Sequence, residues 1–185
     1  MDKLTELPKE LPVPVDDGAC SHLLGKSLPP IALPSTQGGD VILSAIVGRV
    51  VIYCYPMTGQ PGVSLPDGWN EIPGARGCTP QSCSFRDHYQ ELRDLGAQVF
   101  GLSTQSTKYQ IEAKNRLHLP FELLSDSGLS FVSVLNLPTF KAGENRLIKR
   151  VTLIAENGKI AKVFYPVFPP DRNADDVIAW LKEHA

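Results

Sequence analysis

The chain has 185 residues, a mass of 20.2 kDa and a formal net charge of -2, with its basic residues scattered rather than clustered. This length suits one well-buried domain, and scattered charge offers no patch for a nucleic-acid backbone or an anionic membrane surface. Because the sequence shows no signal pattern and no apolar run near the roughly 20 residues of a membrane span, we expect a cytoplasmic protein without nucleic-acid or membrane partners.

Residues 1–26 are expected to form an irregular N-terminal arm. Pro8, Pro12 and Pro14 interrupt this stretch, and it has little hydrophobic periodicity. We assign the arm no chemistry. Residues 27–185 are then predicted to form a single domain, because no internal repeat or second linker divides them.

The next segments predict a buried strand followed by a long loop. A short strand is expected near residues 41–43, and the β-branched run 50–55 is typical of a central strand buried on both faces. Cys54 lies in this run, where a cysteine usually behaves as a small inert apolar residue. The 57–77 segment is rich in Gly and Pro and contains Trp69, and loops of such length are commonly functional.

A helix is predicted from about residue 79 to 95. Thr79 is a suitable cap, Pro80 suits the first turn and Gly96 can end the helix. The pattern then predicts strands at 97–103, 121–126, 148–155 and 160–166, and helices at 107–118, 129–136 and 173–184. Helices that alternate with early strands, followed by a late hairpin, indicate an α/β sandwich with a mixed central sheet.

The first predicted helix separates its two cysteines. Its core-facing stripe has i, i+4 and i+7 spacing and consists of Phe85, Tyr89 and Leu92. Cys78 lies seven residues before Phe85 and shares its inward direction, whereas Cys83 aligns with polar residues such as Asp87. We therefore expect Cys78 to face inward and Cys83 to lie on the polar face, where it is not core filler.

Helix geometry limits what these cysteines can form. Five residues of helix turn the chain by about 140° and advance it about 7.5 Å, whereas a disulfide requires Cα atoms about 4.4 to 6.8 Å apart. Cys78 and Cys83 can therefore bond only if the start of the helix unwinds. The same fan of directions prevents Cys78, Cys83 and His88 from sharing one zinc ion, so we predict no metal site. A thiolate at Cys78 would be stabilised by the free N–H groups of the helix start.

The stretch "GCTPQSCSFRDHYQELRDLGAQVFGLSTQ" resembles the peroxiredoxins, most closely the Q type, also called bacterioferritin comigratory protein. The likeness continues through "SLPPIALPSTQGGDVILSAIVGRVVIYCYP", "LPFELLSD" and "KRVTLIAENGKI", so it covers nearly all of residues 26–165. The resemblance implies a thioredoxin-like fold, a three-layer α/β/α sandwich with a mixed sheet. It also implies reduction of hydrogen peroxide or organic hydroperoxides by thiols, without a cofactor.

The resemblance also implies roles for individual residues. Cys78 matches the peroxidatic cysteine and Cys83 the resolving cysteine, which would form an intramolecular disulfide. Arg150 precedes the strand "VTLI" and matches the activating arginine, although an isolated arginine there would otherwise be read as a solvated strand end. An external dithiol, thioredoxin in this family, is the expected reductant, and the expected state is a monomer or weak homodimer. Cys20 is a less favoured alternative to Cys83.

The 57–77 loop departs from the family motif, which has a proline seven residues and a threonine three residues before the peroxidatic cysteine. Those positions hold Glu71 and Ala75, while Pro56 and Thr58 follow the preceding strand, with 19 residues between Thr58 and Cys78. We interpret this as an insertion within the motif. Pro56 and Thr58 would then keep their places over the substrate pocket. Alternatively, a loop amide or Thr79 replaces the Thr58 hydroxyl.

Two other functions remain open from the residues. A thiol-disulfide oxidoreductase would share the fold, but it typically has a C-x-x-C pair and a nearby proline, whereas this chain has C-x4-C and Val151 after the arginine. A redox sensor without enzymatic activity would use the cysteines as a switch and the loop around Trp69 as a docking surface.

Overall fold

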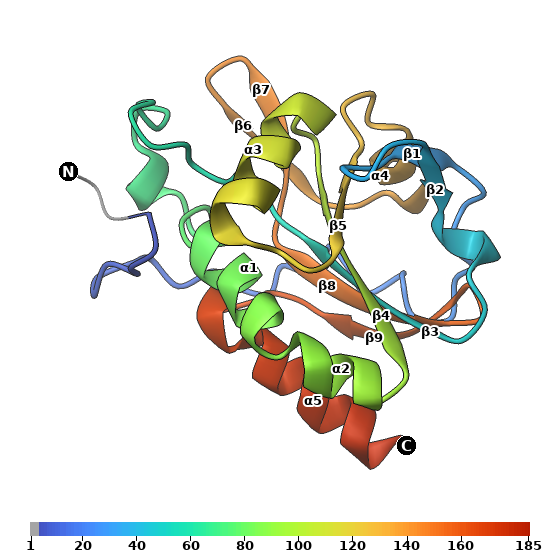
Figure 1. Ribbon diagram of the computed structural model, residues 1–185. Helices are drawn as coiled ribbons and strands as arrows, with labels where there is room; N and C mark the ends of the chain where they lie inside the picture. The colour runs from blue at the N-terminus through green and yellow to red at the C-terminus, as the bar shows by residue number, and fades with distance from the viewer. Residues whose placement is uncertain (1–3) are drawn as a thin grey trace.

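The computed structural model describes residues 4–185 and is built around a five-stranded central sheet (Figure 1). The strands lie in the order β5 (Glu122–Ser125), β4 (Ala97–Ser103), β3 (Arg49–Cys54), β8 (Val151–Glu156) and β9 (Lys159–Phe164). Strands β3, β4 and β5 are parallel to one another, whereas β8 is antiparallel to both β3 and β9. The mixed sheet and the late β8–β9 hairpin predicted from the sequence are confirmed.

Helices cover both faces of this sheet. One face packs against α1 (Cys78–Asp87), α2 (Tyr89–Asp94), α3 (Thr107–Leu117) and α5 (Asn173–Glu183). The other face packs against α4 (Ser130–Leu135), the small sheet of β1 (Ala32–Pro34) and β2 (Asp40–Ile42), and the 3-10 turn η1 (Leu43–Ala45). The architecture is therefore the predicted three-layer α/β/α sandwich (Figure 1).

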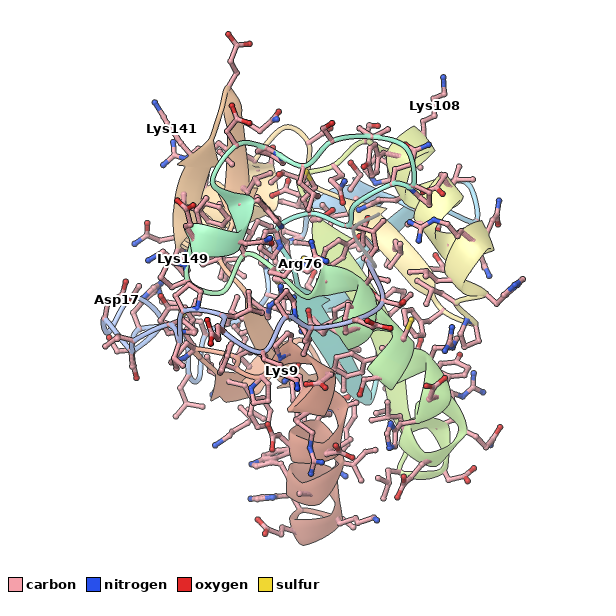
Figure 2. All side chains as sticks on the ribbon, turned by 90° about the vertical axis from the view of Figure 1, so that its left-hand side faces the viewer. Lys9, Asp17, Arg76, Lys108, Lys141 and Lys149 are labelled. Atoms are coloured by element: carbon pink, nitrogen blue, oxygen red, sulfur yellow. The ribbon has the colours of Figure 1, made fainter. Side chains whose placement is uncertain are left out.

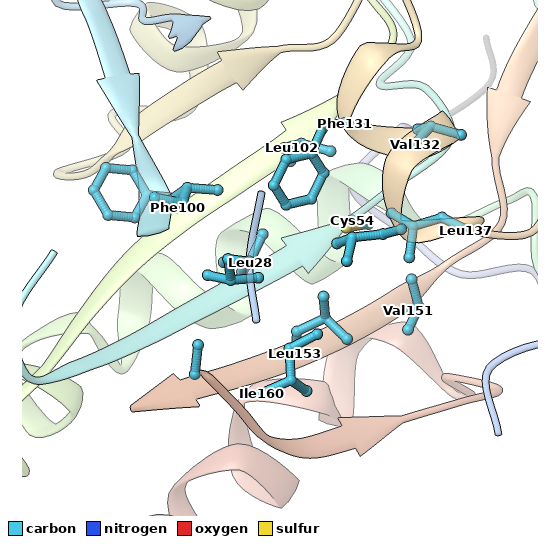
Figure 3. Close-up of a cluster of buried hydrophobic side chains, with 14 of the residues drawn as sticks. Leu28, Cys54, Phe100, Leu102, Phe131, Val132, Leu137, Val151, Leu153 and Ile160 are labelled. Atoms are coloured by element: carbon cyan, nitrogen blue, oxygen red, sulfur yellow. The ribbon is translucent and has the colours of Figure 1, made fainter. Parts of the chain in front are cut away.

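Strand β3 shows how the sequence specifies these layers. Because successive side chains of a strand point to opposite faces, Val50, Ile52 and Cys54 enter the α4-side core, whereas Val51 and Tyr53 enter the core beneath α1. Figure 3 shows Cys54 among the apolar side chains of the first cluster. Cys54 is fully buried, as predicted for a central strand, and burial raises the pKa of its thiol far above the usual range.

The 57–77 loop folds onto a hairpin that the sequence analysis did not predict. This hairpin consists of β6 (Thr139–Ala142) and β7 (Asn145–Ile148), paired antiparallel. A third apolar cluster joins Trp69 and Ala75 of the loop to Ala142 and Leu147 of the hairpin. Trp69, in the 3-10 turn η2 (Trp69–Glu71), is only 4% exposed, so the loop has a small core of its own.

Two predicted elements are each divided in the structure. The helix expected at 79–95 breaks at His88, whose backbone leaves helical geometry between α1 and α2. The strand expected at 148–155 breaks at residues 149–150, where the chain passes from β7 in the hairpin to β8 in the central sheet. Arg150 therefore lies between the two strands and belongs to neither.

The described part of the N-terminal arm, residues 4–26, contains turns and bends but no helix or strand. Its end is nevertheless buried, because Cys20 and Leu23 belong to the α4-side core. The arm crosses the face that contains Arg76, and Lys9 and Asp17 mark its path (Figure 2). Within residues 4–185, no helix is long and apolar enough to cross a membrane.

Candidate active site

The candidate site begins at Cys78, the first residue of α1, whose thiol is buried and 3% exposed. The preceding Gly77 has φ 107°, a left-handed conformation that favours glycine. A Cβ atom at Gly77 would also collide with Pro170 and lie 2.8 Å from Leu7 Cδ2. Glycine is therefore required to bring Cys78 to the start of the helix, where unpaired N–H groups favour a negative charge.

Arg150 reaches Cys78 from the junction of β7 and β8. Its Nη2 donates to Cys78 Sγ at 3.2 Å, and the side chain is 3% exposed. The same nitrogen lies 3.2 Å from the carbonyl oxygens of Gly74 and Ala75 and 3.3 Å from that of Arg76. The guanidinium thus holds the end of the loop and places a buried hydrogen-bond donor beside the sulfur.

A polar network behind Arg150 fixes its position. Gln81, on α1, accepts a short hydrogen bond from Arg150 Nη1 and donates from Nε2 to Asn173 Oδ1 at 2.9 Å. Thr152 Oγ1 donates to the same Asn173 oxygen at 2.7 Å. All three polar residues are essentially buried. Sequence reasoning missed them, although Gln81 lies three residues after Cys78 and hence on the same side of the helix.

Cys83 lies one and a half helical turns after Cys78, and both are free thiols. Cys83 is half buried and packs against the core beneath α1, so it is less exposed than its polar-face position predicts. Burial raises the pKa of the Cys83 thiol, while the nearby Arg86 and Arg116 oppose that rise. The thiol is therefore at the edge of the core, close to two basic side chains.

The predicted threonines take different positions. A cavity of about 10 Å³ beside Cys78 is lined by Thr79, but neither Thr58 nor Pro56 lines it. Thr58 is buried and its Oγ1 donates to Gln105 Oε1 at 3.2 Å, while Pro56 is buried just beyond β3. The structure thus brings Cys78, Arg150 and Thr79 together and leaves Thr58 hydrogen-bonded to another residue.

His88 does not join the two cysteines. Its Nδ1 lies 2.9 Å from the carbonyl oxygen of Ser84, and its Nε2 lies 3.4 Å from Asp175 of α5. Over the described residues, no group of three His, Cys, Asp or Glu side chains is arranged to hold a metal ion. The described residues at this site therefore provide a buried thiol beside an arginine.

The fold and the site together indicate a class of protein. A cysteine at a helix start, an arginine at its sulfur and a second thiol further along the helix are the parts of a cysteine-based redox enzyme.

Solved structures agree on the fold. The crystal structure of peroxidoxin BcpB from Mycobacterium tuberculosis matches with a TM-score of 0.72 and 24% identity, covering 89% of this chain and 99% of that one. A PrxQ variant from Xylella fastidiosa matches with a TM-score of 0.71 and 20% identity, over 88% and 98% of the two chains. The predicted thioredoxin-like fold is confirmed.

The sequence comparisons identify the family. The Redoxin family matches residues 23–178. Peroxiredoxin Bcp of Escherichia coli (strain K12) is 32% identical over 166 residues, covering 87% of this chain and 96% of that protein. The chloroplastic peroxiredoxin Q of Sedum lineare is 31% identical over 160 residues, covering 85% and 77%. The chain belongs to the redoxin family and is a peroxiredoxin of the Q and Bcp type, a thiol-dependent peroxidase, as the sequence resemblance predicts.

Proposed function

We propose that Cys78 is the peroxidatic cysteine of this peroxidase, that Arg150 activates it and that Cys83 resolves it. The 3.2 Å contact between Arg150 Nη2 and Cys78 Sγ is the observation that carries this assignment. Cys20 and Cys54 are unsuited to the role, because burial raises the pKa of Cys20 to about 12 and that of Cys54 further still. Neither has an arginine donating to its sulfur among the described hydrogen bonds.

In the first step the Cys78 thiolate attacks one peroxide oxygen, and the O–O bond breaks as the S–O bond forms. The sulfur is oxidised to a sulfenic acid, and the departing oxygen takes a proton and leaves as water or alcohol. Negative charge grows on that oxygen as the bond breaks. Arg150 and the N–H groups at the start of α1 stabilise this charge, because Arg150 Nη2 already donates to the sulfur and Cys78 is the first residue of the helix.

In the second step Cys83 attacks the sulfenic sulfur, a disulfide forms and water leaves. An intact helix keeps residues five apart about 7.5 Å from each other along its axis, too far for a disulfide with converging side chains. The first turns of α1 must therefore unwind before the bond forms. The disulfide then protects Cys78 from irreversible oxidation by further peroxide.

Thr79 is the hydroxyl residue that we assign to the substrate position. It lines the cavity beside Cys78, whereas Thr58 is committed to Gln105. A hydroxyl in that cavity can accept a hydrogen bond from the peroxide that attacks the thiolate. This choice supports the alternative in which Thr58 has left the site and retains only a structural role in the loop.

The partners and setting are part of the same proposal. An external dithiol of the thioredoxin type reduces the Cys78–Cys83 disulfide, and the protein acts as a monomer or weak homodimer in the cytoplasm. A reducing compartment fits four free cysteines. The matched plant relatives are named chloroplastic.

The alternative functions have less support. A docking role for the 57–77 loop is disfavoured because Trp69 is buried against Phe140, with ring centroids 6.2 Å apart, and does not face solvent. A thiol-disulfide oxidoreductase would need its nucleophile accessible to a protein disulfide, whereas Cys78 is 3% exposed.

Peroxide consumption coupled to thioredoxin and its reductase tests the assignment. We expect the Cys78→Ser variant to lose turnover entirely. We expect the Cys83→Ser variant to consume one equivalent of peroxide and then stop, with Cys78 as a sulfenic acid in the mass spectrum. Turnover in Cys78→Ser, or wild-type protein that forms no Cys78–Cys83 disulfide after peroxide treatment, would refute the proposal.

A further inference from the structure

The cavity beside Cys78 is very small in the structure. Its volume is about 10 Å³, and the cysteine is 3% exposed. A cavity of this size holds at most one water molecule. Hydrogen peroxide has two oxygen atoms, and organic hydroperoxides are larger still. Some part of the wall must therefore move before any peroxide reaches the sulfur.

The first residues of the N-terminal arm form part of this wall. Leu4 lines the Cys78 cavity, and its Cδ2 lies 2.6 Å from the position that a Cβ atom would take on Gly59. The same Cβ position lies 3.2 Å from Leu65 Cδ2, so Leu4 and Leu65 pack together over Gly59. Leu7 packs over Gly77 in the same manner. Glycines at both positions leave room for the arm, which Figure 2 shows crossing this face of the molecule.

The loop that forms the rest of the wall is tied to the folded core. The loop is tied to α3 by a 2.9 Å hydrogen bond from Arg116 Nη2 to the carbonyl oxygen of Gly59, and to Gln105 through Thr58. Trp69 belongs to a buried cluster. By contrast, residues 4–15 belong to no helix or strand. Displacement of this part of the arm therefore breaks no helix or strand.

We propose that Leu4 controls access to Cys78 and selects the peroxide that reacts. Leu4 leaves the cavity with the arm, and the space it vacates receives the hydrocarbon substituent of an organic hydroperoxide. This inference rests on the proposed role of Cys78. The apolar side chains Met57, Leu65 and Trp69 form part of the wall of that space, and its polar lining consists of Arg76 and Thr79. A branched four-carbon substituent matches the side chain that it replaces.

Alkylation of Cys78 by iodoacetamide, followed by mass spectrometry of the reduced protein, tests access without any peroxide. Since only the open form reacts, the rate is proportional to the open fraction. We expect Leu4→Ala to raise the rate at Cys78 on the order of tenfold, because the truncated side chain buries less apolar surface. Val15→Ala is the matched control, since Val15 lies on the same arm but is 81% exposed. Its rate should equal that of the wild type.

The fully buried Cys54 reports on unfolding in the same spectra. In Leu4→Ala the rate at Cys54 should stay at the wild-type value while the rate at Cys78 rises. Equal acceleration of alkylation at Cys54 and Cys78 would mean global destabilisation and would overturn the proposal that Leu4 controls access. Unchanged alkylation of Cys78 in Leu4→Ala would overturn it as well.

Gly59→Ala separates access from selection. The added methyl group displaces the far end of Leu4, but it also occupies part of the vacated space. We expect both variants to react faster with hydrogen peroxide. Only Leu4→Ala should gain an additional severalfold with tert-butyl hydroperoxide, whose hydrocarbon part matches the leucine side chain. If both variants accelerate both peroxides equally, selection by the vacated space is refuted.

The failure of this inference is distinguishable from the failure of the proposed function. If Leu4→Ala accelerates alkylation of Cys78 but no peroxide oxidises Cys78 in any variant, the peroxidatic role is wrong and the gate remains supported. If every variant is oxidised at the wild-type rate and alkylated at the wild-type rate, the peroxidatic role remains supported and the gate is wrong.

Discussion

Gln81 connects the two steps of the reaction, and its replacement should affect them in opposite directions. The residue is fully buried, accepts from Arg150 Nη1 and donates to Asn173 Oδ1 at 2.9 Å. It also lies in the segment of α1 between the two cysteines. Gln81 therefore positions the arginine for the peroxide step and anchors the helical turns that must unwind for the disulfide step.

The magnitude follows from the two hydrogen bonds that Gln81→Ala removes. A hydrogen bond from a charged donor contributes about 1.5–3 kcal/mol and a neutral one about 1 kcal/mol, so the free energy of unfolding should fall by roughly 2–4 kcal/mol. For a chain of this length each kcal/mol lowers Tm by about 2–4 °C. We expect Tm to fall by roughly 4–16 °C. Gln90→Ala is the control, because Gln90 is exposed and bonds only Asp94 among the described contacts.

Stopped-flow measurements separate the two chemical steps. Oxidation of Cys78 by hydrogen peroxide should slow about tenfold in Gln81→Ala, because an arginine that is no longer held misplaces its Nη2 relative to the sulfur. Disulfide formation should accelerate, because the first turns of α1 have lost an anchor to α5. Gln81→Glu, which retains an acceptor for Arg150, should restore much of the first rate. If Gln81→Ala slows or accelerates both steps alike, Gln81 has only a structural role.

Two further predictions concern the hydroxyl and the second thiol. Thr79→Val should slow oxidation of Cys78 by hydrogen peroxide. Thr58→Val should leave that rate unchanged and lower the free energy of unfolding by about 1 kcal/mol. If Thr58→Val slows oxidation in the same stopped-flow assay and Thr79→Val does not, Thr58 occupies the substrate position. Alkylation requires the thiolate form of Cys83, and burial raises the pKa of this thiol. The alkylation rate of Cys83 should therefore rise with pH, and the midpoint pH of this rise should be higher in the folded protein than in the urea-unfolded chain. Arg86→Ala should move that midpoint higher, since Arg86 opposes the rise, and a midpoint below that of the unfolded chain would contradict the structure.

The sequence predicted the layers of the fold well, because burial on a sheet leaves a regular pattern. Strand β3 alternates between two cores, and its residues 50–55 carry that signal plainly. The break at His88 carries no such signal. It coincides with contacts from the His88 ring to Ser84 and to Asp175 of α5, and a long-range contact cannot be read from local periodicity. For the same reason, local periodicity could not predict that the chain passes from one sheet to another at residues 149–150.

At the candidate site, motif spacing was sufficient to find the residues to which we assign the chemistry but not those that enclose them. Cys78 and Arg150 were located by position, and the structure places them in contact. The buried partners Gln81 and Asn173 lie 92 residues apart, so only the tertiary fold joins them. Leu4 was part of an arm to which the sequence assigned no chemistry, because a single leucine in an irregular segment has no pattern to reveal what it covers.

The two ends of the 57–77 loop lie close together, beside Cys78. Met57 and Gly59 at its start and Arg76 and Gly77 at its end line one small cavity, and its middle packs on the β6–β7 hairpin rather than on the central sheet. Closing a loop costs an entropy that grows only slowly with its length. Residues could therefore be gained or lost at its exposed tip, around 61–64, over evolutionary time without displacing the thiol. A change at this tip would act on the cavity only through the neighbouring Leu65, while the contact between Cys78 and Arg150 stays in place.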